Sequence, residues 1–267
     1  LSTRRQRQMC IRDRDKTKVV KALDKFCEEK VEPYIDTCYA ELAEYMNAYQ
    51  QKMFMKREVI ADKGIWTAKK RYILNVHNSE GVQYAEPQLK IMGIEAVKSS
   101  TPAVCRSKIK QALNIIMSQS EKELRTFVND FRQEFEHMPA EKIAFPRSVK
   151  GLKKYMDSNS IFRKSTPMHV KGSLIYNHIL HEKKLLTRFQ EIQEGDKIKY
   201  VLLRKPNTHQ TNVISFLTKL PPQFNFHSVI DYETQFQKSF FEPLKFILEA
   251  INCCLLYTSP SPRDNRV

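Results

Sequence analysis

Glycine is scarce in this chain, and long apolar runs are missing altogether. Only six of the 267 residues are glycine, and they form neither a loop that cradles phosphates nor the turn that presents a nucleophilic serine. No apolar run approaches the ~20 residues that a helix needs to cross a bilayer. We therefore expect a soluble protein with no signal sequence, no transmembrane segment and no membrane partner.

Cysteine is also sparse once the two ends of the chain are set aside. Of six cysteines, only Cys27, Cys38 and Cys105 lie between residues 15 and 252. An odd and scattered set is typical of reduced, intracellular thiols, because a disulfide framework uses cysteines in pairs.

The two ends of the chain carry no apolar periodicity. Residues 1–14 (LSTRRQRQMCIRDR) and 253–267 (CCLLYTSPSPRDNRV) are rich in Arg, Ser and Pro. Both resemble translated sequencing-adapter sequence, so we expect them to be non-native and the native gene to continue beyond them. The alternative is a pair of disordered tails. Neither interpretation gives these ends a fold.

Positive charge is concentrated in the middle of the chain. The whole sequence has 45 Lys and Arg against 30 Asp and Glu, a net charge of +15. Residues 61–118 and 119–186 carry +5 each, whereas residues 15–60 and 187–252 sum to −1 and +1. A basic middle with nearly neutral ends favours a polyanionic partner. A solvated, lysine-rich surface is the alternative.

Apolar periodicity predicts a mixed α+β fold. Helical spacing covers residues 19–49, with a break or a second helix start at Pro33, and returns after Thr101, after Ser120, at 169–181 and from Asp231. Strand patterns cover residues 53–60, 65–76, 82–85 and 197–203, with a turn at 79–81, and residues 139–165 form a basic, irregular stretch. The expected fold is a small antiparallel sheet with helices against one face, followed by a mainly helical part with a short strand.

Two helix starts have capping signals. Thr101 is suited to the N-cap with Pro102 at the first helical position. Ser120 and Glu123 have the spacing of a capping box. The helix after Ser120 places Phe127, Phe131 and Phe135 on one stripe with other apolar residues, and we expect this stripe to lie in the core rather than to stack on bases.

Three consecutive cations, Lys69, Lys70 and Arg71, open a strand-like run that continues through Tyr72. Alternation along a strand would place Lys70 and Tyr72 on one face and Lys69 and Arg71 on the other. The triplet would then not form a flat binding patch. Taken alone, such a triplet also occurs on many solvated strand edges.

A second cation, Lys98, leads through Ser99 and Ser100 to the helix start at Thr101. Backbone N–H groups at a helix N-terminus, hydroxyl groups and a lysine are all suited to hold a phosphate. A capped helix without any ligand is the alternative.

Several segments together resemble a family B DNA polymerase of the T-even bacteriophage type, where the palm domain passes into the thumb. They are residues 66–72 (WTAKKRY), 85–95 (AEPQLKIMGIE), 98–102 (KSSTP), 32–36 (EPYID) and 41–47 (ELAEYMN).

The resemblance covers about residues 19–251 and becomes thinner after Pro102. It continues as islands at 167–172, 176–177, 195–198 and 243–244. The loop at residues 62–65 is shorter than the glycine-rich loop of the T-even type, and residues 204–227 match poorly.

The resemblance implies a domain division and a set of DNA contacts. It assigns residues 15–100 to the C-terminal part of the palm and 101–252 to the thumb. It implies that Lys69, Lys70, Arg71 and Tyr72 contact primer–template DNA with reach into the minor groove, whose acceptors are shared by all correct base pairs. It implies further that Lys98, Ser99, Ser100, Thr101 and Lys171 contact DNA, the first four through backbone phosphates.

The resemblance also implies catalysis by residues that this chain lacks. Family B polymerases hold two Mg²⁺ ions on palm aspartates, one of them in an Asp-Thr-Asp-Ser string, for attack of the primer hydroxyl on a deoxynucleoside triphosphate. That string is absent, and Ile35-Asp36-Thr37-Cys38 lacks the second aspartate. We therefore assign no catalytic and no metal-binding residue and expect the chain alone to be inactive. For His169, His178 and His181, solvated or core positions are favoured over a metal site.

The sequence thus favours part of a phage replicative DNA polymerase that grips the primer–template duplex in the host cytoplasm. A sliding clamp is a possible partner of a C-terminal segment that is missing here. One alternative is a stand-alone DNA-binding accessory module, or one piece of a split polymerase. A helical protein-interaction scaffold whose basic face is only solvated is a third.

Overall fold

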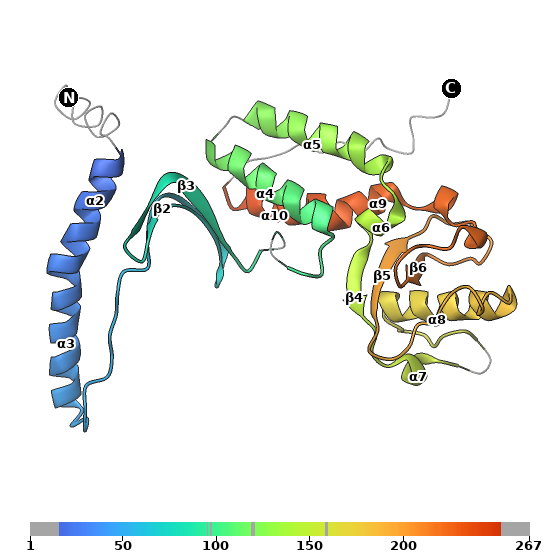
Figure 1. Ribbon diagram of the computed structural model, residues 1–267, viewed down its shortest axis with the longest axis horizontal. Helices are drawn as coiled ribbons and strands as arrows, with labels where there is room; N and C mark the ends of the chain where they lie inside the picture. The colour runs from blue at the N-terminus through green and yellow to red at the C-terminus, as the bar shows by residue number, and fades with distance from the viewer. Residues whose placement is uncertain (1–15, 95, 97, 119–120, 158–159, 252–267) are drawn as a thin grey trace. The chain divides into compact units, whose positions relative to one another are not determined.

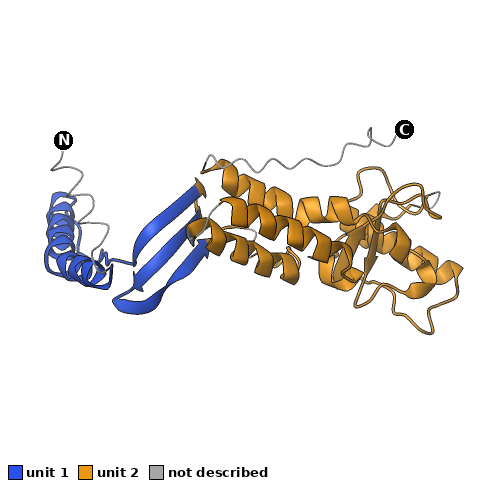
Figure 2. Ribbon diagram, turned by 90° about the horizontal axis from the view of Figure 1, so that it is seen from above, with its two compact units in different colours: residues 1–66, 72–91 blue, residues 67–71, 92–267 orange. Residues whose placement is uncertain are grey.

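A computed structural model describes residues 16–94, 96, 98–118, 121–157 and 160–251 and shows an α+β fold, as the sequence predicted (Figure 1). The chain divides into two compact units, coloured separately in Figure 2. Unit 1 comprises residues 1–66 and 72–91, and unit 2 comprises residues 67–71 and 92–267. Both predicted non-native ends lie outside the described residues, as does Ser120 of the predicted capping box.

Unit 1 begins with one continuous helical run. Helix α2 (Lys16–Phe26) leads through the π-helical turn η1 (Cys27–Val31) into α3 (Glu32–Tyr45). Pro33 lies in the first turn of α3 and has no N–H to donate to the preceding turn, so a wider turn at this point is physically reasonable. At Pro33 the run therefore changes helix type and starts α3 without breaking, which agrees with a second helix start rather than with a break.

The sheet of unit 1 contains three strands in the order β1 (Val59–Ala68), β2 (Arg71–Ser79) and β3 (Val82–Met92). The β2–β3 turn has positive φ at both Glu80 (50°) and Gly81 (85°), as a two-residue hairpin requires. Strand β2 is central and buries most of the apolar side chains of the sheet, at Ile73, Leu74 and Val76.

Two strand predictions in this region were wrong. The predicted strand at residues 53–60 begins only at Val59, and the predicted strand at 65–76 is interrupted by a hairpin turn at Lys69 and Lys70. Lys70 has a left-handed φ of 62°. The predicted alternation of Lys69, Lys70 and Arg71 across two strand faces therefore does not apply. The sequence hid the turn because no glycine, asparagine or proline marks it.

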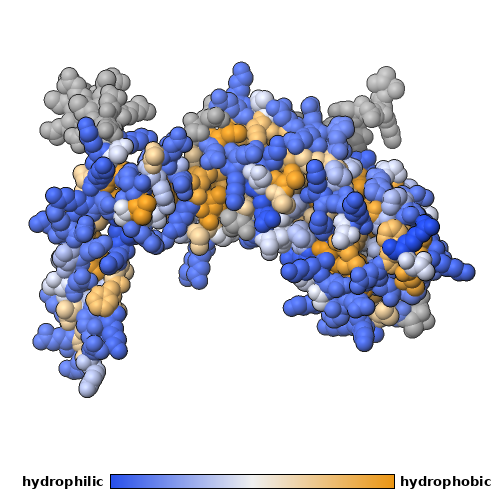
Figure 3. All heavy atoms as spheres, viewed as in Figure 1, coloured by the Kyte–Doolittle hydropathy of each residue, from blue (hydrophilic) through white to orange (hydrophobic). Residues whose placement is uncertain are grey.

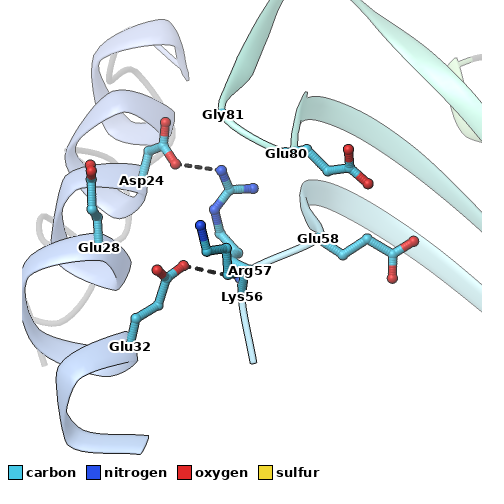
Figure 4. Close-up of a pocket in the computed structure, with 8 residues that line it drawn as sticks. All are labelled: Asp24, Glu28, Glu32, Lys56, Arg57, Glu58, Glu80 and Gly81. Atoms are coloured by element: carbon cyan, nitrogen blue, oxygen red, sulfur yellow. Dashed lines mark hydrogen bonds and ion pairs between the residues drawn. The ribbon is translucent and has the colours of Figure 1, made fainter. Parts of the chain in front are cut away.

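Polar contacts connect the helical run of unit 1 to its sheet (Figure 4). The Arg57 guanidinium donates to the carboxylate of Asp24 on α2 and, at 2.9 Å, to Oδ1 of Asn78 on β2. Asn78 in turn donates to Asp24 at 3.1 Å, and the Arg57 backbone N–H donates to Glu32 at 3.1 Å. Helices beside the sheet were expected, but polar groups rather than a broad apolar interface make these contacts.

Unit 2 contains a phenylalanine core between helices from its two ends. The helices are α4 (Ala103–Ser118) and α5 (Glu121–Glu136) from its beginning, and α9 (Tyr232–Phe236), the π-helical turn η4 (Gln237–Phe241) and α10 (Glu242–Glu249) from its end. The rings of Phe131 and Phe240 lie 4.8 Å apart and those of Phe135 and Phe236 lie 5.4 Å apart. The predicted core role is confirmed for Phe131 and Phe135, whereas Phe127 is half-buried.

The second sheet of unit 2 is antiparallel, in the order β4 (Phe145–Ser148), β5 (Lys197–Leu202) and β6 (Val213–Phe216). Helix α8 (Met168–Glu182) packs on β6. Gly172 allows this close approach, because a Cβ there would lie 2.5 Å from the Ser215 hydroxyl oxygen. Short helical turns complete the unit: α6 (Ala140–Ile143), α7 (Leu152–Tyr155), η2 (Pro222–Phe224) and η3 (His227–Val229).

The sequence predicted the longer elements of unit 2 and missed the shorter ones. Helix α8, strand β5 and the final helical run from Asp231 lie where expected. Helix α4 begins at Ala103, one residue later than predicted. Strand β4 was missed because Pro146 lies within it, which is compatible only with an edge strand. Strand β6 was missed because four consecutive buried residues show no alternation.

Candidate nucleic-acid interface

A groove of about 390 Å³ in unit 2 brings together predicted and unpredicted residues. Segments distant in the sequence supply its walls: the turn before α4, strands β4 and β5, and helices α8, η4 and α10. It is lined by Lys98, Ser100, Thr101, Phe145, Arg147, Met168, Tyr200, Leu202, Lys238, Glu242 and Pro243. Three cations against one carboxylate make this lining electropositive.

The turn before α4 supplies the predicted part of the groove. The Thr101 N–H donates to the carbonyl of Lys98 at 3.2 Å, which closes a four-residue turn. The Thr101 side chain is buried, whereas Lys98 is exposed. Ser99 is exposed and is not among the described residues that line the groove. The first turn of α4 contains no acidic residue, so the positive end of the helix dipole is not offset there.

Strands β4 and β5 supply a second cation and a phenol. Arg147 on β4 lies in register opposite Ile198, two residues from Tyr200 on β5. Burial raises the pKa of Tyr200 above its usual value, and a hydrogen bond from Arg147 offsets part of that rise. Burial, followed by the nearby charge of Arg147, lowers the pKa of His169. The phenol and the imidazole are therefore both neutral at pH 7, and Arg147 carries the charge of this wall.

The final helical run supplies the third cation. Lys238 lies on η4 and is exposed, and Glu242 at the start of α10 lies one turn further along the chain. The π-helical turn η4 makes this part of the run wider than an α-helix, just before Pro243. Lys238 was not among the predicted site residues.

The predicted Lys-Lys-Arg triplet lies at the β1–β2 hairpin turn and is not among the groove-lining residues. Lys69 and Lys70 are exposed. The guanidinium of Arg71 lies 4.8 Å from the ring centroid of Phe246 on α10, a cation–π contact. Tyr72, the fourth residue of the predicted set, is half-buried and belongs to unit 1.

Lys171, the remaining predicted contact, lies on α8 and is held by neighbours within unit 2. Its Nζ donates to Oδ1 of Asn212 at 2.9 Å and lies 4.6 Å from the ring centroid of Phe162. Burial, with the nearby charge of Lys205 as a second cause, lowers its pKa. Met168, one turn earlier on α8, lines the groove, but Lys171 does not.

The described residues do not fit a metal centre. Within them, no group of three or more His, Cys, Asp or Glu side chains is placed to hold an ion. His181 pairs with Glu191 at 2.5 Å, and His169 is half-buried beside Arg147. The described part of the chain also contains no helix with the length and apolar character needed to span a membrane.

Arg147, Tyr200 and Lys238 were missed by the sequence analysis. Arg147 belongs to the stretch that was recognised as basic, but Pro146 concealed the strand that positions it. Only the tertiary fold brings β4, β5 and η4 to the same groove, so no local pattern could have identified the three residues together.

Comparison with known proteins gives two extended similarities. The chain is 32% identical over 251 residues to a DNA-directed DNA polymerase of Enterobacteria phage T4, covering 90% of this chain. It is 36% identical over 245 residues to a DNA-directed DNA polymerase of Escherichia phage RB69, covering 87% of this chain. The chain spans 27% of the length of each relative. No protein-family model matches the chain.

Proposed function

We propose, starting from the confirmed relationship of this chain to the T-even phage DNA polymerases, that its electropositive groove holds backbone phosphates of a primer–template duplex. One observation carries the proposal: Lys98, Arg147 and Lys238, from three separate segments, line one groove together with the Thr101 hydroxyl. Lysine, arginine and hydroxyl groups are the usual partners of phosphate oxygens and carry no sequence preference. A site of this kind suits an enzyme that copies any template.

The hairpin turn offers a second group of cations for the same duplex. Lys69 and Lys70 are exposed at this turn, and Lys171 is positioned on α8 by Asn212. We assign these residues, with Arg71, Tyr72 and Ser99, to DNA contacts that supplement the groove, and we assign Ser100, which lines the groove, to the groove itself. In this proposal, residues 15–100 act as the C-terminal part of the palm and residues 101–252 as the thumb.

The intact enzyme would add deoxynucleotides to a primer. We assign its two Mg²⁺ ions and the deoxynucleoside triphosphate to residues of the intact enzyme other than the described ones, among which no group of three or more His, Cys, Asp or Glu side chains is placed to hold an ion. The chain alone would therefore bind DNA and synthesise none. A sliding clamp would bind elsewhere on the intact enzyme, which would work in the cytoplasm of the phage host.

Salt-dependent DNA binding tests the groove assignment. Fluorescence anisotropy with a labelled hairpin primer–template should give a log–log salt slope near −5 if about six phosphates are engaged. Arg147→Ala and Lys238→Ala should each make that slope shallower by about 1 and weaken binding uniformly across sequences.

The matched control is Lys122→Ala, which removes one exposed cation from α5 away from the groove lining. It should leave the slope unchanged. A slope near zero for the unaltered chain, or equal losses in Lys122→Ala and Arg147→Ala, would count against the groove.

A further inference from the structure

Phe246 is an aromatic side chain that the core of unit 2 does not use. On α10, Leu244, Ile247 and Leu248 are buried and form the stripe that packs inward, whereas Phe246 lies off this stripe and is 42% exposed. Exposed apolar residues are common in themselves, and Figure 3 shows others at the surface of the helical part of unit 2. What marks Phe246 is its partner, the guanidinium of Arg71 at the basic hairpin turn, which lies 4.8 Å from the ring centroid.

The hairpin turn that carries the cations has an unfavourable conformation. Lys70 has a left-handed φ of 62°, which a residue with a side chain adopts only at an energetic cost. Neither Lys69 nor Lys70 is a glycine or asparagine, the residues that usually occupy such positions. A strained conformation persists where the surrounding structure holds it. Contacts from outside the hairpin therefore add to the support that the pairing of β1 with β2 gives.

Two contacts within unit 2 hold this turn, one through the main chain and one through a side chain. The Lys70 carbonyl lies so close to Gly93 that a Cβ there would be 2.5 Å from its oxygen. The next residue, Arg71, is half-buried and reaches the Phe246 ring. Figure 2 accordingly colours the hairpin tip, residues 67–71, with the helices of unit 2. The turn is thus held at two successive residues, while the side chains of Lys69 and Lys70 remain exposed.

We propose that Phe246 is a positioning residue, whose ring holds Arg71 and thereby presents the cations of the β1–β2 turn to the duplex. This inference rests on the proposed function, which assigns Lys69, Lys70 and Arg71 to DNA contacts. A single cation–π contact at an exposed site is too weak to decide whether the phenylalanine core of unit 2 folds. It is strong enough to change the population of a strained turn about threefold.

Amide hydrogen exchange on the chain without DNA tests whether Phe246 holds the turn. Phe246→Leu removes the ring but keeps an apolar side chain, and residues 67–71 should then exchange about threefold faster, because the turn opens more often. Exchange in α4 and α5 should not change. Phe246→Tyr keeps an aromatic face and should restore the slower exchange. Leu186→Ala is the matched control, because Leu186 is another exposed apolar residue of unit 2 outside the groove lining.

A double-mutant cycle of DNA binding tests whether the held turn serves the duplex. Fluorescence anisotropy with the hairpin primer–template at fixed salt should show that Phe246→Leu weakens binding about threefold. Lys70→Ala should also weaken it about threefold in the unaltered chain, but by little in the Phe246→Leu chain, because a lysine on a released turn no longer contributes. A loss of general stability would instead multiply with the loss from Lys70→Ala. Phe246→Tyr should bind as tightly as the unaltered chain.

Three results would overturn the role of Phe246: unchanged exchange of residues 67–71 in Phe246→Leu, faster exchange with unchanged DNA binding, or losses in the cycle that simply multiply. The groove is judged separately, because Phe246→Leu leaves its cations Lys98, Arg147 and Lys238 in place. A salt slope near zero for the unaltered chain contradicts the proposed function. A steep slope with a multiplicative cycle contradicts the role of Phe246 alone.

Discussion

Asp62 on β1 shows how single side chains stabilise the sheet of unit 1. Its carboxylate accepts hydrogen bonds from Lys16 at 2.9 Å and Asn75 at 2.7 Å, and His77 Nε2 lies at 3.3 Å. Burial alone would raise the pKa of Asp62, but these hydrogen bonds outweigh it and lower the pKa to about 2. The charged form is therefore favoured by folding, and α2 is linked to the sheet through Lys16.

Asp62→Asn should remove part of the acid sensitivity of unit 1. A pKa lowered in the folded state gives stability that is present above the unfolded value of 3.8 and is lost as the pH falls toward about 2. Because the Asp62 carboxylate is partly screened by solvent, its contribution to the free energy of unfolding is limited to about 1 kcal/mol. Urea unfolding followed by Trp66 fluorescence at pH 7 and pH 2.5 measures it. The variant should be less stable than the unaltered chain at pH 7 and nearly equal at pH 2.5.

Asp36→Asn is a suitable control because Asp36 is an exposed carboxylate on α3. It should change stability little at either pH. A constant difference between Asp62→Asn and the unaltered chain across this pH range would contradict the assignment of the acid dependence to Asp62.

At the scale of elements, the β1–β2 hairpin depends on a glycine that lies beyond β3. Gly93 has a φ of 67°, and a Cβ at this position would lie 2.5 Å from the Lys70 carbonyl oxygen and 3.0 Å from Arg71 Cγ. The chain can therefore pass close to the basic turn only because residue 93 has no side chain.

Gly93→Ala should destabilise unit 2 by about 2–3 kcal/mol, because it adds a clash with backbone to a left-handed conformation. Gly81→Ala is the matched control, with a φ of 85° and no atom within 4 Å of the added Cβ. It should cost only about 1 kcal/mol, from backbone strain alone. Urea unfolding measures the free energy of unfolding of both variants. An equal loss in Gly93→Ala and Gly81→Ala would show that the close approach of Lys70 to Gly93 adds nothing to the destabilisation.

The elements also show what the sequence could and could not predict. Helices α4, α5 and α8 were predictable because each repeats an apolar stripe over several turns. The turn at Lys69 and Lys70 was not, because its conformation is imposed by the pairing of β1 with β2 and no turn residue marks it. Lys98 and Thr101 were identified from a resemblance, whereas Arg147 and Lys238 join them only through tertiary packing.

At the scale of the whole molecule, burial is divided unequally between the two units. Of the described apolar residues that are buried, unit 1 contains only Val20, Ile65, Ile73, Leu74 and Val76, and unit 2 contains all the others. Burying a large apolar side chain contributes roughly 1.5–3 kcal/mol. We therefore expect unit 1 to open well before unit 2, at a free energy below that of global unfolding.

Two spectroscopic probes can separate these transitions. The only tryptophan, Trp66, lies on β1 in unit 1, whereas the far-ultraviolet circular dichroism includes the large helical contribution of unit 2. In urea, Trp66 fluorescence should change at a lower midpoint than the circular dichroism, because the transitions are not coincident. Amide exchange should agree, with fast exchange in α2 and α3 and slow exchange in α4, α5 and α8.

Coincident midpoints would mean that the two units unfold together, and the sparse burial of unit 1 would then need another source of stability within this chain.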